Sequence, residues 1–250
     1  MLWVHELDHT VGRIVSERRR DHLLAQTDRI VAVGPAVGTM VRDRWGVPPS
    51  DVTVLPSFAD APDPREQPPT GPHEVVAIGS LTARKAPDLF VAVVAYLARH
   101  HGPVDAAWVG GPLDGPTAAL VRHDLGDSGA GRVTELVGEV DDTLPWLPAD
   151  GVLVHVARED PAPLVVLEAA LRAVPVVTWD GGGAAELAHL AGRPDLVVPP
   201  GDVAALARRI AHLLDDAGDR ARAGAALAAA AKARTTGAVA PRLLDAITDG

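Results

Sequence analysis

The sequence predicts an α/β protein whose main domain is a doubly wound parallel sheet of the Rossmann-like type. Two observations predict this class. From Glu74 onward, short and continuously apolar runs alternate with helical stretches, which is the pattern of a parallel sheet covered on both faces. Before that point a shorter series of the same alternation indicates a truncated N-terminal α/β portion, followed by a proline-rich segment.

Residues 1–60 contain too few elements for a complete Rossmann domain. We expect strands at 2–4, 28–33 and 52–55, and helices at 8–25 and 35–45. The second helix begins at a proline, where a missing backbone N–H costs nothing. The first carries Arg18–Arg20, which is more typical of a solvated helix face than of a phosphate or lipid contact. We therefore interpret residues 1–60 as the remnant of an N-terminal Rossmann domain, with an unpaired sheet edge that invites self-association or a partner chain.

Residues 61–73 contain five prolines and few apolar side chains, which predicts a stiff interdomain linker. Residues 74–235 predict the main domain, and residues 236–250 a C-terminal helix. The strands of the main domain are expected at 75–78, 106–109, 133–137, 152–156, 176–178 and 196–198. Its helices are expected at 87–100, 115–125, 141–146, 164–173, 184–190, 202–214 and 220–233, and the C-terminal helix at 239–247.

Composition excludes several classes of protein. The net charge of −10 and the aromatic content of 3% argue against nucleic acid or an anionic membrane as the main partner. The sequence has no cysteine, so neither a disulfide framework nor a thiolate metal site is possible. No uncharged apolar run is long enough for a membrane span, and the acidic start does not match a signal peptide. We expect a cytoplasmic protein.

The most informative stretch surrounds a helix that is apolar on almost every side. Between Leu164 and Ala173 only Glu168 and Arg172 are polar, and a carboxylate in such a helix requires a hydrogen-bond partner. Asp160 precedes Glu168 by seven intervening residues. Because ligands bind outside the carboxyl ends of parallel strands, this βαβ unit predicts a binding site at one sheet edge.

The order of these motifs resembles the retaining glycosyltransferases of family 4, which have the GT-B fold. In that family an acidic residue and a glutamate at this spacing precede a Pro-Val-Val strand and a Gly-Gly-x-x-Glu turn. Here they are Asp160 and Glu168, the strand beginning at Pro175, and the turn from Gly182 to Glu186. The resemblance extends over essentially the whole chain, but it includes only the last part of the N-terminal domain.

The resemblance implies a role for several residues around the donor. Lys85 falls on the lysine that faces the donor diphosphate, and Arg84 supplies a second charge because Ser80 stands where the family has an arginine. Glu168 would accept hydrogen bonds from the nucleotide ribose, unless it is a core carboxylate satisfied by the protein itself. Asp160 would read the sugar hydroxyls, and Glu159 takes that role if the loop is shifted by one residue.

The remaining candidates come from the same resemblance. His5, in a His-Glu pair, would lie close to the transferred sugar, although a lone histidine is more often structural. Gly79 closes the first strand of the second domain, and Gly138 matches a loop beside the nucleobase. The turn residues Gly182, Gly183 and Glu186 would border the donor, although an ordinary strand-to-helix turn has the same pattern.

The implied function is transfer of a sugar from a nucleotide diphospho-sugar to an acceptor hydroxyl, with retention of anomeric configuration and without a metal or other cofactor. The acceptor is left open between a glycan, a lipid and a small molecule. Because the N-terminal domain is incomplete, a non-catalytic module that binds a nucleotide sugar or a partner protein is the alternative. A purely structural interaction domain is the third interpretation.

Overall fold

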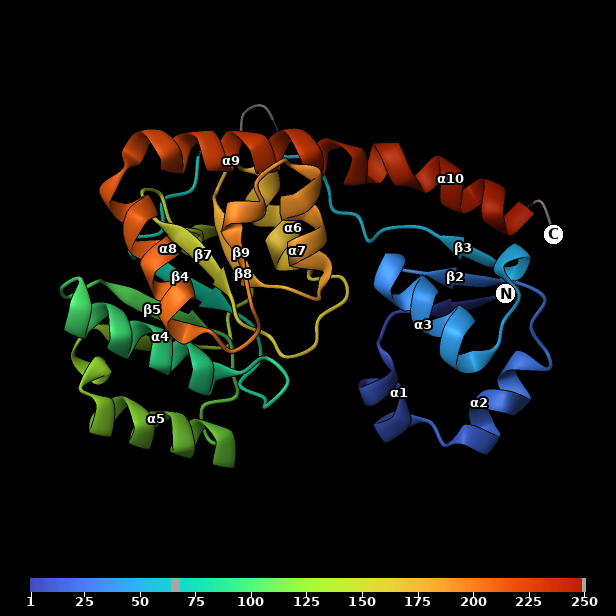
Figure 1. Cartoon of the computed structure of the whole chain (residues 1–250), viewed down its shortest axis with the longest axis horizontal. Coiled ribbons are helices and arrows are strands. Elements are labelled where there is room, and N and C mark those ends of the chain that lie inside the picture. Colours follow the sequence, from blue (N-terminus) through green and yellow to red (C-terminus); the bar gives the residue numbers. More distant parts are fainter. Residues whose placement is uncertain (64–67, 249–250) are drawn as a thin grey trace.

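Residues 1–63 and 68–248 are described by a computed structural model, in which two separate parallel sheets lie along the long axis of the molecule (Figure 1). The smaller sheet has three strands in the order β1-β2-β3. The larger has six strands in the order β6-β5-β4-β7-β8-β9. Of the predicted linker, residues 64–67 lie outside the described ranges.

The three-stranded sheet is formed by β1 (Leu2–Val4), β2 (Ile30–Ala32) and β3 (Val52–Val54). Its helices are α1 (Asp8–Ile14), α2 (Glu17–Leu24) and α3 (Pro35–Trp45). The single helix expected at 8–25 is wrong, because the chain is extended at Val15 and restarts at Ser16. The Ser16 hydroxyl accepts the backbone N–H of Arg19 at 3.4 Å, which is how serine caps a new helix.

The six-stranded sheet confirms the predicted doubly wound topology. Numbered from its own first strand, the order is 3-2-1-4-5-6, so strand order reverses between β4 and β7. All its pairs are parallel, and their registers align the carboxyl ends of β4, β7 and β8 at one edge. The strands are β4 (Val75–Ile78), β5 (Ala106–Val109), β6 (Thr134–Gly138), β7 (Val152–His155), β8 (Val176–Trp179) and β9 (Val197–Val198).

Helices cover both faces of this sheet (Figure 1), because right-handed crossovers leave a switch point in opposite directions. Where residues 141–146 predict a helix, the structure has only a short 3-10 turn at Leu144–Trp146, with Pro145 inside it. No helix in the described ranges is long and apolar enough to cross a membrane. The helices are α4 (Pro87–His100), α5 (Pro116–Ser128), α6 (Leu164–Leu171), α7 (Gly183–Leu190), α8 (Val203–Asp215) and α9 (Ala217–Ala231).

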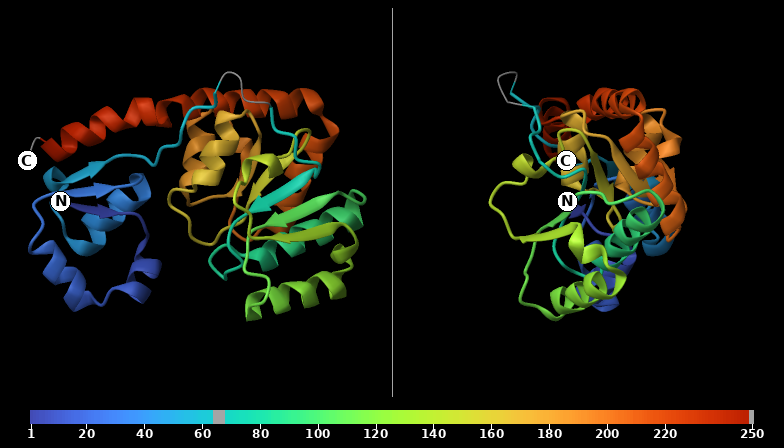
Figure 2. Two further views of the ribbon diagram at one scale, coloured as in Figure 1. Left: turned by 180° about the vertical axis from the view of Figure 1, so that it is seen from behind. Right: turned by 90° about the vertical axis from the view of Figure 1, so that its left-hand side faces the viewer.

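Two segments connect the sheets, and they run side by side. The first is the chain after β3, and the second leads into α10 (Thr236–Thr248). Helix α10 lies beside the small sheet in Figure 1 and in the left view of Figure 2. Ala59 accepts the N–H of Thr236 at 2.9 Å and donates its own N–H to Arg234 at 3.2 Å. The Thr236 hydroxyl also donates to Asp60 at 2.6 Å. Near the end of α10, the carbonyl of Ala246 accepts a hydrogen bond from Arg29 at 3.3 Å.

Candidate functional site

Two loops meet where the strand order reverses, one after β4 and one after β7. The N–H of Arg158 donates to the carbonyl of Arg84 at 2.8 Å, and the guanidinium of Arg84 donates to the carbonyl of Glu159 at 3.0 Å. The Arg158 guanidinium reaches Ala83 at 2.7 Å and pairs with Asp88. These crossing hydrogen bonds hold the two loops together over a distance of 75 residues in sequence.

Side chains from neighbouring strands anchor the strand ends beneath these loops. The indole N–H of Trp108 donates to the carbonyl of Gly79 at 2.9 Å, and that of Trp179 to Val156 at 3.0 Å. The Thr178 hydroxyl donates to the carbonyl of His155 at 3.0 Å. Trp108, Trp179 and Thr178 are buried, so these bonds fix the backbone from which the loops depart.

Lys85 and Asp160 are predicted separately, for the diphosphate and for the sugar, and the fold brings them into direct contact. The Lys85 ammonium donates to Asp160 Oδ2 and forms an ion pair with it. The side chains are only 16% and 10% exposed, so the pair is largely desolvated. The stem of Lys85 lies over Gly79, whose missing side chain leaves room for it. An ion pair this buried is sensitive to the loss of either partner.

His155 lies beneath this ion pair, at the last position of β7. Its Nε2 lies 3.5 Å from Asp160 Oδ2, yet that nitrogen is buried and makes no hydrogen bond within the described residues. The pKa of His155 is lowered from 6.5 to about 4, mainly because the ring is buried; Asp160 opposes this shift, and Lys85 and Arg84 contribute to it. The imidazole is therefore neutral near pH 7.

A pocket of about 290 Å³ joins the two sheets next to Asp160. His5 and Glu6 contribute to it from the end of β1, and Arg84 and Asp160 from the large sheet. Three of the residues predicted to contact the donor thus share one pocket: His5 and Asp160, expected at the sugar, and Arg84, expected at the diphosphate. The rest of the lining is Trp3, Ser57, Phe58, Pro161, Ala162 and Leu164.

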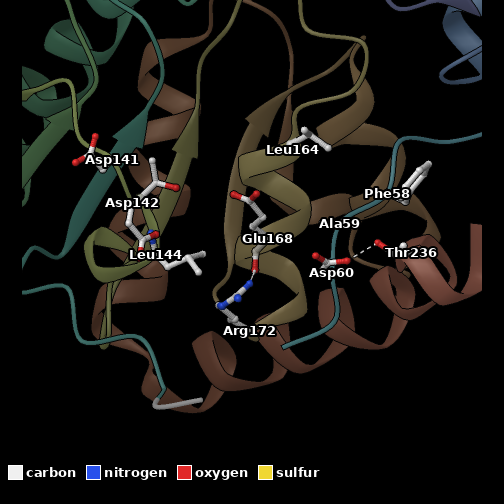
Figure 3. A pocket seen from close by; sticks show the side chains of 11 residues that line it. Phe58, Ala59, Asp60, Asp141, Asp142, Leu144, Leu164, Glu168, Arg172 and Thr236 are labelled. Atoms are coloured by element: carbon white, nitrogen blue, oxygen red, sulfur yellow. Dashed lines mark hydrogen bonds between the residues drawn. The ribbon is translucent and has the colours of Figure 1, made fainter. Parts of the chain in front are cut away.

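A larger pocket of about 710 Å³ lies next to the first and shares Phe58 and Leu164 with it. Glu168 projects from α6 into this space, opposite the loop that carries Asp141 and Asp142 (Figure 3). The segment around Phe58 closes the opposite side, beside the bond between Asp60 and Thr236 (Figure 3). Glu168 and Asp160 therefore reach two adjoining pockets at one sheet edge.

The carboxylate of Glu168 is half-buried without a cation in ion-pair contact among residues 1–63 and 68–248. Burial raises its pKa, the nearby Arg172 guanidinium lowers it, and the Asp142 carboxylate raises it further. Arg172 spends one of its hydrogen bonds on the backbone carbonyl of Glu168, at 3.2 Å. Glu168 thus faces the pocket with Arg172 and Asp142 as its charged neighbours, and its role toward the ribose stays a prediction.

The glycine-rich turn packs against the Asp160 loop. The N–H of Gly183 donates to the carbonyl of Asp160 at 3.1 Å. A Cβ on Gly183 would lie 2.3 Å from the carbonyl oxygen of Pro161, and one on Gly182 would lie 3.0 Å from that of Asp160. The close approach predicted for this turn is therefore made to the protein's own backbone, and it supports the carboxylate loop.

Seven predicted residues line neither pocket: Lys85, Gly79, Gly182 and Gly183, which are described above, and Glu186, Glu159 and Gly138. Glu186 takes the backbone N–H of Ala36 at the start of α3, and its carboxylate lies 3.6 Å from the Arg234 guanidinium. Glu159 accepts the N–H of Thr10 at 3.3 Å and faces a separate cavity of about 360 Å³. Gly138 ends β6, two strands from β4, with a φ of 89°. Their roles toward the donor stay predictions.

Sequence reasoning missed two residues of the site. His155 ends an apolar strand, so its pattern is that of an ordinary core residue; its place directly before the carboxylate loop was the available signal. Phe58 lies in the segment after β3, and only the folded chain brings it to both pockets. Within the described ranges, no group of three or more His, Asp or Glu side chains is arranged as metal ligands are.

Comparison with known proteins agrees with this architecture. The model of the family described as Glycosyl transferases group 1 matches residues 72–216. A glycogen synthase from Mycobacterium tuberculosis is 29% identical over 199 residues, which are 78% of this chain and 47% of that protein. The chain thus spans about half the length of the curated glycogen synthases it matches.

Solved structures extend the likeness over nearly the whole chain. Anabaena Alr3699/HepE, crystallised with UDP, has a TM-score of 0.81 at 19% identity, over 100% of this chain and 72% of that one. Sucrose-phosphate synthase from Thermosynechococcus elongatus has a TM-score of 0.78 at 20% identity, over 99% of this chain and 67% of that one. At these identities the likeness concerns the fold, and it confirms the Rossmann-like GT-B class.

Proposed function

Because this chain belongs to the glycosyl transferases group 1 family, we propose that it transfers a sugar from a nucleoside diphosphate sugar to an acceptor hydroxyl with retention of anomeric configuration, as family 4 enzymes do. One observation carries the proposal: the pocket that joins the two sheets is lined by His5, Arg84 and Asp160. A cation, a carboxylate and a histidine from two sheets converge on a space of sugar size.

The donor is proposed to span both pockets. Its diphosphate would contact Lys85 and Arg84, because cations at the switch point of such a sheet stabilise a departing phosphate. Glu168 would accept hydrogen bonds from the ribose hydroxyls in the larger pocket. Asp160 would bind the sugar hydroxyls, with His5 on the opposite side. UDP in the Anabaena relative makes uridine nucleotides the first donors to test.

In the proposed reaction the bond between the anomeric carbon and the diphosphate oxygen breaks, and a bond from that carbon to the acceptor oxygen forms on the same face. The acceptor proton passes to the leaving diphosphate. Lys85 would lower the barrier by neutralising charge that develops on that diphosphate, and the proposal requires no metal or other cofactor. We keep the cytoplasm as the proposed location, since a chain without cysteine suits a reducing compartment.

A thermal-shift panel of UDP, GDP, ADP and their sugars tests the proposal. Wild type is expected to be stabilised by one nucleotide, because a ligand that binds only the folded state raises the melting temperature. Glu168→Ala should lose that response, and Glu17→Ala, which removes an exposed glutamate in α2, should keep it. No response of wild type to any nucleotide would contradict the proposal.

Release of nucleotide from the stabilising donor separates the enzyme from the alternative. The transferase is expected to release nucleoside diphosphate faster when acceptor candidates, such as a glycan, a lipid or a small polyol, are supplied. Stabilisation by the nucleotide without release under any of these conditions would identify a module that binds nucleotide sugars without turnover.

A further inference from the structure

His155 is a buried polar group that the proposed reaction leaves unused. Its side chain is 9% exposed, and Nε2 is buried without a hydrogen bond among the described residues. A buried polar atom without a partner carries a free-energy cost, so such an atom beside a functional group calls for an explanation. The nearest charged atom recorded for Nε2 is Asp160 Oδ2, at 3.5 Å.

That oxygen of Asp160 is already occupied. It accepts a hydrogen bond from the Lys85 ammonium. On the proposed function, however, Lys85 turns to the donor diphosphate, and Asp160 then loses its cation while only 10% exposed. An ionised carboxylate that is so little exposed requires another hydrogen-bond donor. The Arg84 guanidinium already holds the carbonyl of Glu159 at 3.0 Å.

We propose that His155 is a positioning residue for Asp160, and that its neutral imidazole donates Nε2–H to the carboxylate when Lys85 moves to the diphosphate. This inference rests on the proposed function. A movement of a few tenths of an ångström shortens the 3.5 Å separation to a hydrogen bond. Because His155 replaces Lys85 as the hydrogen-bond donor to Asp160, the carboxylate stays oriented toward the sugar hydroxyls throughout donor binding.

The surroundings of His155 suit a neutral donor. Asp160 faces it from the following loop, and Lys85 and Arg84 face it from the loop after β4. A third positive charge next to these two cations would be unfavourable, whereas a neutral ring donates one N–H without adding charge. The bond from Thr178 to the carbonyl of His155, at 3.0 Å, holds the backbone of the ring in place.

The test begins with the ligand-free protein and a pair of matched variants. His155→Gln keeps an N–H donor near the position of Nε2, and His155→Leu removes it. Each is made in wild type and in Lys85→Met, where Asp160 has no cation. We expect His155→Leu to lower the urea midpoint more in the Lys85→Met background than in wild type. In the Lys85→Met background, His155→Gln should avoid most of this additional loss of stability. Equal effects in both backgrounds would overturn the proposal.

The second measurement compares the affinities for UDP-glucose and UDP. Loss of a hydrogen bond to a charged group is expected to weaken UDP-glucose by about tenfold in His155→Leu, while UDP changes less than about twofold. His155→Gln should bind both nearly as wild type does. A merely structural role would weaken both ligands equally and overturn the proposal. Wild type could also bind neither ligand while His155→Leu still destabilises the Lys85→Met variant more than wild type. That outcome would contradict only the proposed function with a uridine donor.

Discussion

Lys85 and Asp160 form an ion pair across the point where the strand order of the large sheet reverses, although 75 residues separate them in sequence. Each is the side chain that the motif analysis assigned to one part of a nucleotide sugar. The pair therefore holds both groups at the proposed site before the donor arrives, and the donor must compete with Asp160 for the lysine.

Replacing Lys85 tests the diphosphate contact. Lys85→Met is expected to weaken nucleoside diphosphate binding by roughly 10- to 100-fold, because a charge-assisted hydrogen bond contributes about 1.5–3 kcal/mol. Isothermal titration calorimetry measures the change. The control is Lys232→Met, which removes the other lysine of the chain at an exposed position. Equal affinities in wild type and Lys85→Met would remove Lys85 from the site.

The pKa of Glu168 makes nucleotide binding depend on pH. Burial raises that pKa, with Arg172 opposing and Asp142 adding to the shift, so the carboxylate gains a proton at a higher pH than an ordinary glutamate. A protonated carboxyl is a poorer acceptor for ribose hydroxyls, so affinity should fall as pH is lowered through the raised pKa. Glu168→Gln should bind more weakly at pH 7 and show a flatter pH profile. A wild-type affinity that stays constant on acidification would contradict this role.

His155 should make folding stability sensitive to acid. Its pKa is about 4 in the folded protein and 6.5 in the unfolded chain, so between these values the unfolded state binds more protons. Stability is therefore lost as pH falls from 6.5 to about 4, by about 3 kcal/mol in total. Urea unfolding across this range measures the effect.

The matched variants for that measurement are His155→Gln and His123→Gln, the latter at a side chain that is 69% exposed. His155→Gln should reduce the loss of stability on acidification, and His123→Gln should leave it unchanged. The same acid dependence in His155→Gln as in wild type would mean that other groups cause it.

Gly183 is expected to tolerate no side chain. A Cβ would lie 2.3 Å from the carbonyl oxygen of Pro161, so Gly183→Ala should displace the Asp160 loop and cost about 2 kcal/mol. Gly126→Ala is the opposite case, since no atom lies within 4 Å of its added Cβ in the exposed helix α5. That change should stabilise by about 0.5–1 kcal/mol. Denaturant unfolding of both variants checks the difference, and equal effects would contradict it.

Glu186 and Arg234 should couple the two sheets. Burial raises the pKa of Glu186 and lowers that of Arg234, and each counteracts the shift of the other. Glu186→Gln and Arg234→Met are each expected to destabilise the protein, with a coupling energy of roughly 0.5–3 kcal/mol in a double-mutant cycle. Because Glu186 also takes the N–H of Ala36, its loss should loosen α3. A loss of nucleotide affinity in Glu186→Gln as large as in Lys85→Met would instead support the donor contact predicted from the sequence.

The regular alternation of short apolar runs with helical stretches made most of the fold predictable from the sequence. Each expected strand of both sheets is present, because short apolar runs that alternate with helices are typical of the buried strands of a parallel sheet. The failures lie where local signals compete. Ser16 begins a second helix inside a periodic apolar pattern, and Pro145 prevents an α-helix after β6.

The candidate site was predictable only as far as its motifs. The family resemblance singled out Asp160 and Glu168, and the structure places them at two adjoining pockets. The partners of buried groups did not follow, because pairing depends on loops that meet only after folding. Glu186 with Arg234 and His155 with Asp160 are two such cases. No local pattern marks either contact.

The hydrogen bonds between Ala59 and its neighbours Arg234 and Thr236 have a mechanical consequence. The covalent connection between the sheets, which follows β3, and the segment that leads into α10 are hydrogen-bonded to each other here, so these bonds restrain movement of one sheet relative to the other. The two sheets are therefore held together in two ways, covalently through the linker and non-covalently through α10. A single proteolytic cut in the linker would leave them joined through α10, which Arg29 fastens near its far end.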